Sequence, residues 1–416
     1  MKKSNQAKAS KHEYGVDFIS NMPDPILQLI LQGLPTTEEV LRTSVLSTRW
    51  RYLWTSIPYF PSLDIDCYRT ARTPSLNFPK KKFEDFVTWC LANKIVGLDS
   101  LRLCCASYYT ESTVMGWIKE AVNRNVKSLD LMLYLKSEYT WSVSTVVFPK
   151  WLVTCDALDV LRLNLYGHAS LILAGRTELR FRPLRVLELN NVYCGQTYEI
   201  EQFITMSPLL EELILIHCFQ RIIGCVRISS PKLKTLIVRN WKNTIYRLVG
   251  CMLEKAVILP DDKMHLSISH HMGDNICKVL AKLSRVESLS INLYFIQCID
   301  AARDRIGNFP ASFPNLKSLE VTTTIDAFTI NVIIHILRCS PYLESLHLVI
   351  QKRGVTGSLS YVLSIRSPDT REHFGQPVID KRRRRWNIYE VVDTVVSMIG
   401  ESELVDSWYL FVEKTV

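Results

Sequence analysis

Several features that mark common protein classes are missing from this sequence. No apolar run approaches the roughly 18 residues needed to cross a bilayer, which argues against a membrane-spanning protein. The first fifteen residues are polar and carry lysines without the apolar segment of a signal peptide, so we expect a protein of the nucleus or the cytoplasm.

Signatures of catalysis and metal binding are missing as well. There is no glycine-rich phosphate loop, no Gly-x-Ser-x-Gly turn and no His-Glu-x-x-His motif. The histidine cluster of His265, His270 and His271 has no cysteine or acidic residue placed to complete a tetrahedral metal site, so an exposed loop is the simpler interpretation. We therefore expect neither catalytic activity nor a cofactor.

The cysteines and the basic residues do not indicate a special site. Twelve cysteines are scattered without a Cys-x-x-Cys pair, which favours buried free thiols. Much of the net charge of +9 comes from the N-terminal lysines and from residues 381–385. That basic run fits a solvated segment or a nuclear import signal, and nucleic-acid binding remains a minor alternative.

A short phrase, apolar-x-x-Leu-x-apolar, recurs along most of the chain. The Leu-x-apolar part alternates with period two, as a strand with one buried face must. The spacing lies near the upper end of the roughly 20–29-residue period of leucine-rich repeats. The middle positions of the copies are Leu101, Leu129, Leu161, Leu187, Leu213, Leu236, Leu289, Leu319 and Leu346, with a degraded copy at Ala256.

The segments between the copies carry apolar residues at helical spacing. Two of them end at the pairs Ser207-Pro208 and Ser340-Pro341, where proline disfavours helix in the preceding residue. A strand and a helix per repeat cannot bury an apolar face alone, so the repeats should stack into a curved solenoid with a parallel sheet on its concave side. A doubly wound α/β domain, the alternative, would not repeat one phrase so often.

The positions between and after the repeated leucines are expected to face the concave surface. Arginine and tryptophan are common interface anchors, which makes Arg162, Arg239 and Trp241 candidate contacts to a protein partner. Alternatively, the arginines are solvated and Trp241 packs against a loop. The predicted concave residues are Arg102, Arg162, Asn164, Glu188, Asn190, Ile214, Ile216, Arg239, Trp241, Asn292, Glu320 and His347.

Residues 17–66 follow a different pattern, that of three short helices. Asp24 and Pro25 start the first, and its apolar stripe ends at Gly33. Thr36 and Glu39 form a capping box for the second. The third carries two tryptophans and leads to Pro58. Because such a small unit buries little core, a partner or the adjoining arc should complete it.

This N-terminal pattern resembles the F-box of the large plant family of F-box leucine-rich-repeat proteins. The matching elements are Met22-Pro23-Asp24, Ile26-Leu27, Leu34-Pro35-Thr36, Thr43-Ser44-Val45-Leu46-Ser47, Arg49-Trp50-Arg51 and Leu53-Trp54. Met22 stands where the family has leucine, and Thr48 takes a position that is usually basic. The resemblance covers about residues 17–350, and the signature of the C-terminal FBD module found in many relatives is absent after Gly354.

The resemblance implies a non-catalytic subunit of an SCF-type ubiquitin ligase. Its F-box would bind a Skp-family adaptor held by a cullin, and its arc would hold a protein target for ubiquitination. The alternative is a leucine-rich-repeat recognition or scaffold protein without a ligase role. The implied adaptor contacts are Pro23, Ile26, Leu27, Ile30, Leu31, Leu34, Pro35, Val45, Leu46 and Trp50.

The sequence thus predicts an α/β protein in which a three-helix F-box precedes a leucine-rich-repeat solenoid. We expect a disordered basic tail at residues 1–16, the F-box and first strand at 17–66, and the solenoid at 67–354. Residues 355–416 are unassigned, although apolar residues at helical spacing between 388 and 399 suggest an end cap for the last repeat.

Overall fold

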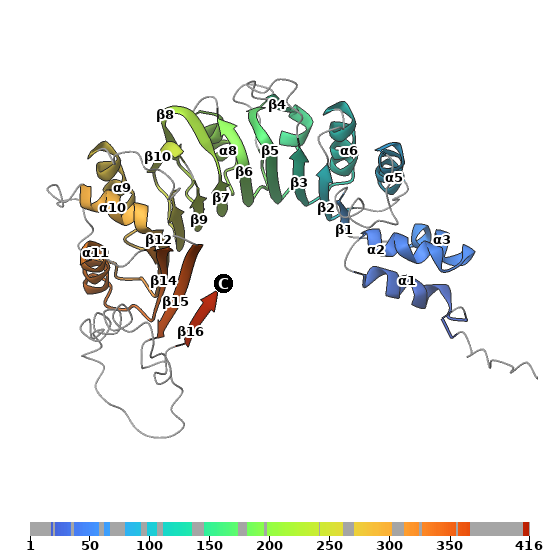
Figure 1. Ribbon diagram of the computed structural model, residues 1–416. Helices are drawn as coiled ribbons and strands as arrows, with labels where there is room; N and C mark the ends of the chain where they lie inside the picture. The colour runs from blue at the N-terminus through green and yellow to red at the C-terminus, as the bar shows by residue number, and fades with distance from the viewer. Residues whose placement is uncertain are drawn as a thin grey trace, which may run out of the picture.

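The computed structural model shows three short helices at one end of a curved sheet whose outer side carries further helices and strands (Figure 1). The structure describes residues 18–19, 21–34, 37–57, 62–66, 80–92, 98–105, 111–134, 145–173, 181–194, 198–240, 242–260, 270–301, 312–323, 327–354, 357–366 and 411–415. The predicted α/β architecture with a concave parallel sheet is confirmed.

The N-terminal unit contains α1 (Asp24–Gln32), α2 (Thr37–Arg42) and α3 (Thr48–Leu53), with 3-10 turns η1 (Thr43–Val45) and η2 (Trp54–Ser56). Gly33 ends α1 as expected, and the Ser47 hydroxyl caps α3 by accepting from the Trp50 amide at 3.3 Å. Helix α1 begins one residue earlier than the proline predicts, because Pro23 takes the N-cap position. Thr36, the predicted cap of α2, lies outside the described residues.

Eleven parallel strands form the sheet of the arc, and their order along it follows the sequence. Their middle leucines lie directly opposite one another in one continuous row, in which Ala256 takes the place of a leucine. Each strand supplies one repeat. The strands are β1 (Ser62–Asp66), β2 (Ser100–Cys105), β3 (Ser128–Tyr134), β5 (Val160–Leu173), β6 (Val186–Cys194), β7 (Glu212–Ile216), β9 (Thr235–Arg239), β11 (Lys255–Leu259), β12 (Ser288–Asn292), β13 (Ser318–Thr323) and β14 (Ser345–Gly354).

The convex side carries the helices that the spacing predicts, together with strands that it does not. Helices α8 and α11 end just before their Ser-Pro pairs, as expected. Between β7 and β11 the convex layer instead consists of β8 (Phe219–Ile228) and β10 (Lys242–Leu248), which pair with each other in parallel. The helices are α5 (Lys80–Ala92), α6 (Glu111–Asn123), α7 (Lys150–Val153), α8 (Tyr198–Thr205), α9 (His270–Lys282), α10 (Leu293–Ala301) and α11 (Ala327–Arg338), and β4 (Thr145–Phe148) pairs with the end of β5.

Two antiparallel strands follow the last parallel strand of the arc. Strand β15 (Gly357–Arg366) runs antiparallel to β14, and β16 (Phe411–Thr415) runs antiparallel to β15, so the sheet continues beyond residue 354. These strands pair with the edge that β14 would otherwise present, and β16 is the last described strand of the sheet. The predicted helical cap at residues 388–399 lies outside the described residues.

One apolar core runs through the whole molecule. It begins with Leu27 in α1, passes Trp54 and Trp89 at the junction, and continues through the repeated leucines to Leu348. The middle leucines are at most 1% exposed. The N-terminal unit is therefore completed by the arc, as its small size predicts.

Candidate docking and recognition surfaces

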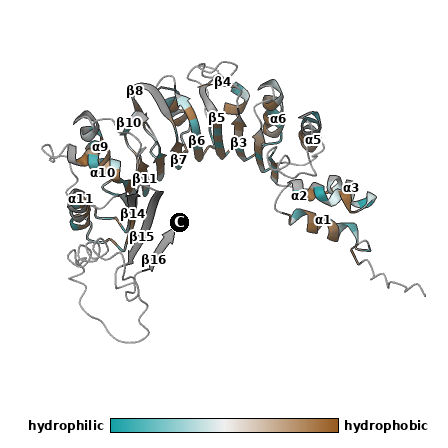
Figure 2. Ribbon diagram, viewed as in Figure 1, coloured by the Kyte–Doolittle hydropathy of each residue, from teal (hydrophilic) through white to brown (hydrophobic). Residues whose placement is uncertain are grey.

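Helix α1 has two apolar faces with opposite environments. Leu27 and Leu31 are fully buried in the N-terminal unit, whereas Ile26 and Ile30 are each 45% exposed and Leu29 is 64% exposed. Figure 2 shows α1 as mostly hydrophobic, in contrast to α2 and α3. A short helix with apolar residues around most of its circumference needs a second surface to pack against.

Exposed apolar side chains are concentrated in this unit. Of the twelve large apolar side chains that are exposed in the described part of the chain, eight lie between residues 18 and 52. Val45 at 86% and Leu46 at 62%, which lie between α2 and α3 in the chain, are exposed as well. We call the exposed side chains of Phe18, Ile19, Ile26, Leu29, Ile30, Val45 and Leu46 the F-box surface.

The structure divides the predicted adaptor contacts into two groups. Pro23, Ile26, Ile30, Val45 and Leu46 are exposed and available to a partner. Leu27, Leu31 and Trp50 lie in the core at 0%, 0% and 4% exposure, so in this conformation they support the surface and do not form it. Leu34 is partly buried against the core, and Pro35 lies outside the described residues.

Leu29 is missing from the predicted contacts although it is more exposed than Ile26 or Ile30. The signal for it was present in the sequence, because Leu29 follows Ile26 by three residues and therefore shares its side of a helix.

Polar contacts fix the start of α1 against α3. The Arg49 guanidinium pairs with the Asp24 carboxylate through Nε at 2.8 Å and donates to the Met22 carbonyl at 2.6 Å. Gln28 Nε2 donates to Ser56 Oγ at 3.0 Å. Asp24, which the sequence predicts to begin the helix, therefore also links the start of α1 to α3.

The N-terminal unit is also packed onto the arc. The rings of Trp54 in η2 and Trp89 in α5 meet edge to face with centroids 3.9 Å apart. Thr37, only 3% exposed, accepts through Oγ1 a hydrogen bond of 2.9 Å from the Asp64 amide of β1. These contacts fix the direction in which the F-box surface faces relative to the concave sheet.

The concave face carries a ladder of alternating charges across its first five strands. In each strand the residue between the two repeated apolar positions belongs to what we call the middle row. Arg102 Nη1 lies 2.9 Å from Asp64 Oδ1 and its Nε lies 3.5 Å from Asp130 Oδ2, while Arg162 Nε lies 3.5 Å from Glu188 Oε2. The five opposed residues are Asp64, Arg102, Asp130, Arg162 and Glu188.

The ladder is partly shielded from water. Burial raises the pKa of the Asp130 carboxyl, and the flanking Arg102 and Arg162 oppose this effect without cancelling it. Burial likewise raises the pKa of the Glu188 carboxyl against the opposing effect of Arg162. The two arginines are therefore already engaged by acids on the protein itself.

From β7 to β11 the same row is apolar, and from β12 to β14 it is polar again. Ile214, Ile237 and Val257 follow Glu188 in register, and Ser290, Glu320 and His347 complete the row. The next residues on the same face form what we call the outer row, in which Ile216, Arg239 and Leu259 lie opposite one another. We call Ile214, Ile216, Ile237, Arg239 and Leu259 the central patch.

The predicted substrate contacts do not form one cluster. Arg162 belongs to the ladder and pairs with Glu188, whereas Arg239 lies in the outer row of β9. Three strand spacings, about 14 Å, separate β5 from β9. Trp241 lies outside the described residues, so the trio reduces to one engaged arginine and one exposed arginine.

In the part of the chain that the structure describes, the thiols and histidines form no recognisable chemical site. Cys218 is a free thiol, and burial raises the pKa of this thiol to about 12, which makes its thiolate scarce. Within the described ranges, no three histidine, cysteine or acidic residues could hold a metal ion. His270 and His271 begin α9 instead of lying in the predicted loop, whereas His265 and the basic run at residues 381–385 lie outside the described residues.

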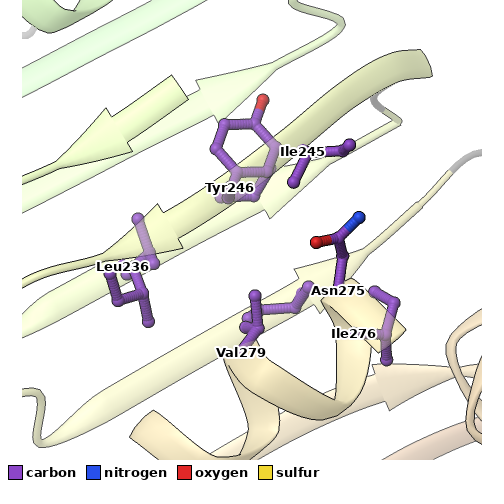
Figure 3. Close-up of a pocket in the computed structure, with 9 residues that line it drawn as sticks. Leu236, Ile245, Tyr246, Asn275, Ile276 and Val279 are labelled. Atoms are coloured by element: carbon purple, nitrogen blue, oxygen red, sulfur yellow. The ribbon is translucent and has the colours of Figure 1, made fainter. Parts of the chain in front are cut away.

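Two further features bear on function. A cavity of about 20 Å³ lies between α9 and strands β9 to β11, where side chains such as Leu236, Tyr246 and Val279 come together (Figure 3). It has room for about one water molecule and is far smaller than a small-molecule site. Among the described helices, none is both long and apolar enough to cross a membrane.

Comparison with known proteins agrees with both parts of the structure. Residues 114–348 match the family described as FBD-associated F-box protein At5g56370, LRR repeats, and residues 19–61 match the F-box domain. Among similar proteins of Arabidopsis thaliana, Putative F-box protein At1g49610 is 29% identical over 80% of this chain and 84% of its own length. F-box/LRR-repeat protein At5g02910 is 28% identical over 80% of this chain and 72% of its own length. With more than half of its residues in the repeat match and an F-box before them, the chain belongs to the plant family of F-box proteins with leucine-rich repeats.

Proposed function

We propose that this protein is the substrate-recognition subunit of an SCF-type ubiquitin ligase. In this proposal the F-box surface binds a Skp-family adaptor, and the adaptor connects the protein to a cullin. The arc binds a protein target. The observation that carries the proposal is the concentration of exposed apolar side chains on the F-box. Large exposed apolar side chains that gather in one part of a protein mark an interaction site.

The proposed mechanism requires no bond chemistry in this chain. A target held on the arc and a conjugating enzyme held by the ligase become parts of one assembly, which raises the effective concentration of the target lysine. The packing of Trp54 on Trp89 supports this role, because a fixed junction limits the directions from which the target can be presented.

The test measures binding of a purified Skp-family adaptor to the full chain and to an Ile26→Asp/Ile30→Asp variant. Both side chains are already 45% exposed, so the variant should fold while losing the apolar contact and adaptor binding with it. Met252→Asp/Tyr342→Asp, which places the same two charges on 63% and 68% exposed side chains of the arc, serves as the matched control. Failure of the wild-type chain to bind any adaptor would favour a scaffold protein without a ligase role.

A further inference from the structure

On the concave face, Arg239 is an exposed arginine for which the described residues provide no acidic partner. In the ladder, Arg102 lies between Asp64 and Asp130, and Arg162 pairs with Glu188. Arg239 is exposed, and no described residue forms an ion pair with it. A partner's carboxylate would have to displace an existing acid at either ladder arginine, whereas none of the described acidic residues occupies that place at Arg239.

Apolar side chains surround this arginine. Its two register neighbours are Ile216 on β7 and Leu259 on β11, and Ile237 precedes it on the same face of β9. Ile216, Ile237 and Leu259 are only half-buried, so they remain accessible. A cation within aliphatic side chains complements an occupant that carries an acid beside apolar groups.

Polar residues border the central patch where the strands end. His217 and Asn240 follow β7 and β9 at equivalent positions with φ of 51° each. Their amides donate to the carbonyls of Arg239 and Leu259 at 3.0 and 2.7 Å, and Asn240 Nδ2 lies 3.3 Å from His217 Nε2. An apolar centre with a polar rim is the usual composition of a protein interface.

We propose that the central patch is the docking site for a protein segment carrying an aspartate or glutamate flanked by aliphatic or aromatic residues. This inference rests on the proposed function, because it names the class of target that the arc presents. The acid pairs with Arg239, and the flanking side chains cover Ile214, Ile216 and Leu259. The site spans three neighbouring strands of the concave sheet, which suits an extended segment better than a small molecule that needs an enclosing pocket.

The test selects peptides from a randomised display library on the immobilised full chain. Wild type should enrich peptides in which an acidic residue lies beside apolar ones. Arg239→Glu should replace that acidic preference with a lysine or arginine preference, and Arg239→Ala should weaken a selected peptide about tenfold or more. Arg162→Ala is the matched control, because that arginine is engaged by Glu188, and it should leave the preference unchanged.

Three results would overturn the inference: no enriched peptide on the wild-type chain, an acidic preference that survives Arg239→Glu, or one that is lost in Arg162→Ala. Circular dichroism of each variant shows whether the arc remains folded. Adaptor binding is measured on the same samples. Peptide selectivity without adaptor binding would refute the ligase role alone, and adaptor binding without selectivity would refute this docking site alone.

Discussion

The F-box and the arc differ in how much of their apolar side chains they expose to solvent. In the arc, the middle leucine of nearly every repeat faces the core and is at most 1% exposed. In α1, by contrast, Leu27 and Leu31 are buried while Leu29 and Ile30 face solvent. The arc buries its repeated apolar side chains in its own core, whereas the F-box leaves several of its apolar side chains exposed to solvent. This difference suits a unit that docks to a partner beside a unit that presents a surface.

The largest expected effect comes from placing the same charge in each region. Leu187→Asp buries an unpaired carboxylate in the core and should cost more than about 4 kcal/mol, enough to unfold the neighbouring repeats. Leu29→Asp, on a 64% exposed side chain, should change the free energy of unfolding by less than about 1 kcal/mol. Chemical denaturation followed by circular dichroism measures both. Equal losses of unfolding free energy in the two variants would contradict the difference between the two regions.

A second pair of variants separates support from contact within α1. Leu27→Ala removes a fully buried side chain and should lower the free energy of unfolding by about 2–5 kcal/mol. Ile30→Ala should leave stability nearly unchanged and weaken adaptor binding by more than about 1 kcal/mol. Thermal denaturation and adaptor titration on the same proteins distinguish the two effects. A destabilised Ile30→Ala that binds normally would contradict this division.

A third variant tests the junction between the two regions. Trp89→Ala removes the ring that packs on Trp54 and should cost about 2 kcal/mol, less than a fully buried tryptophan because Trp89 is only partly buried. Limited proteolysis should then cleave faster between the F-box and the arc. Trp151→Ala, which removes a partly buried tryptophan within the arc, is the matched control. Faster cleavage at that same boundary in the control would show that the junction has no special role.

The smallest expected effect concerns the ladder. The pKa of the Asp130 carboxyl is raised in the folded protein. Its protonated form therefore stabilises the fold at pH values below the ordinary pKa of 3.8, and this contribution is lost as pH rises through the pKa of the folded protein. Asp130→Asn removes this titration, so the variant should become more stable relative to wild type as pH rises from 3.8 through the pKa of Asp130 in the folded protein. Because Asp130 is partly solvated, the change should stay below about 1 kcal/mol. Denaturation curves across the acidic range measure it, and a pH-independent difference would contradict the assignment.

The repeats could be predicted from sequence because their signal is local. A Leu-x-apolar phrase specifies one buried strand face whatever its neighbours are, and even the degraded copy at Ala256 forms a strand in register. The convex strands β8 and β10 could not be predicted in this way. Their place in the repeat is one that elsewhere holds a helix. Their backbone groups are satisfied by pairing with each other and, at the start of β8, with β6.

The candidate sites show the same division. The F-box pattern identified the N-terminal helical unit, but whether Leu27 or Leu29 faces outward depends on where α3 and the arc lie against α1. Arg162 and Arg239 are alike in sequence, as both stand beside repeated apolar residues. The pairing of neighbouring strands places Arg162 in the ladder of charges, whereas it places Arg239 among apolar side chains.

The sequence by itself therefore determined the order of modules, the repeat and the buried face of each strand, because these depend on periodicities within one segment. Only the tertiary structure decided which charges meet, which apolar residues remain exposed and how the sheet ends in the antiparallel strands β15 and β16. Those outcomes depend on which residues of neighbouring segments come into register, and that register links residues roughly one repeat apart along the chain.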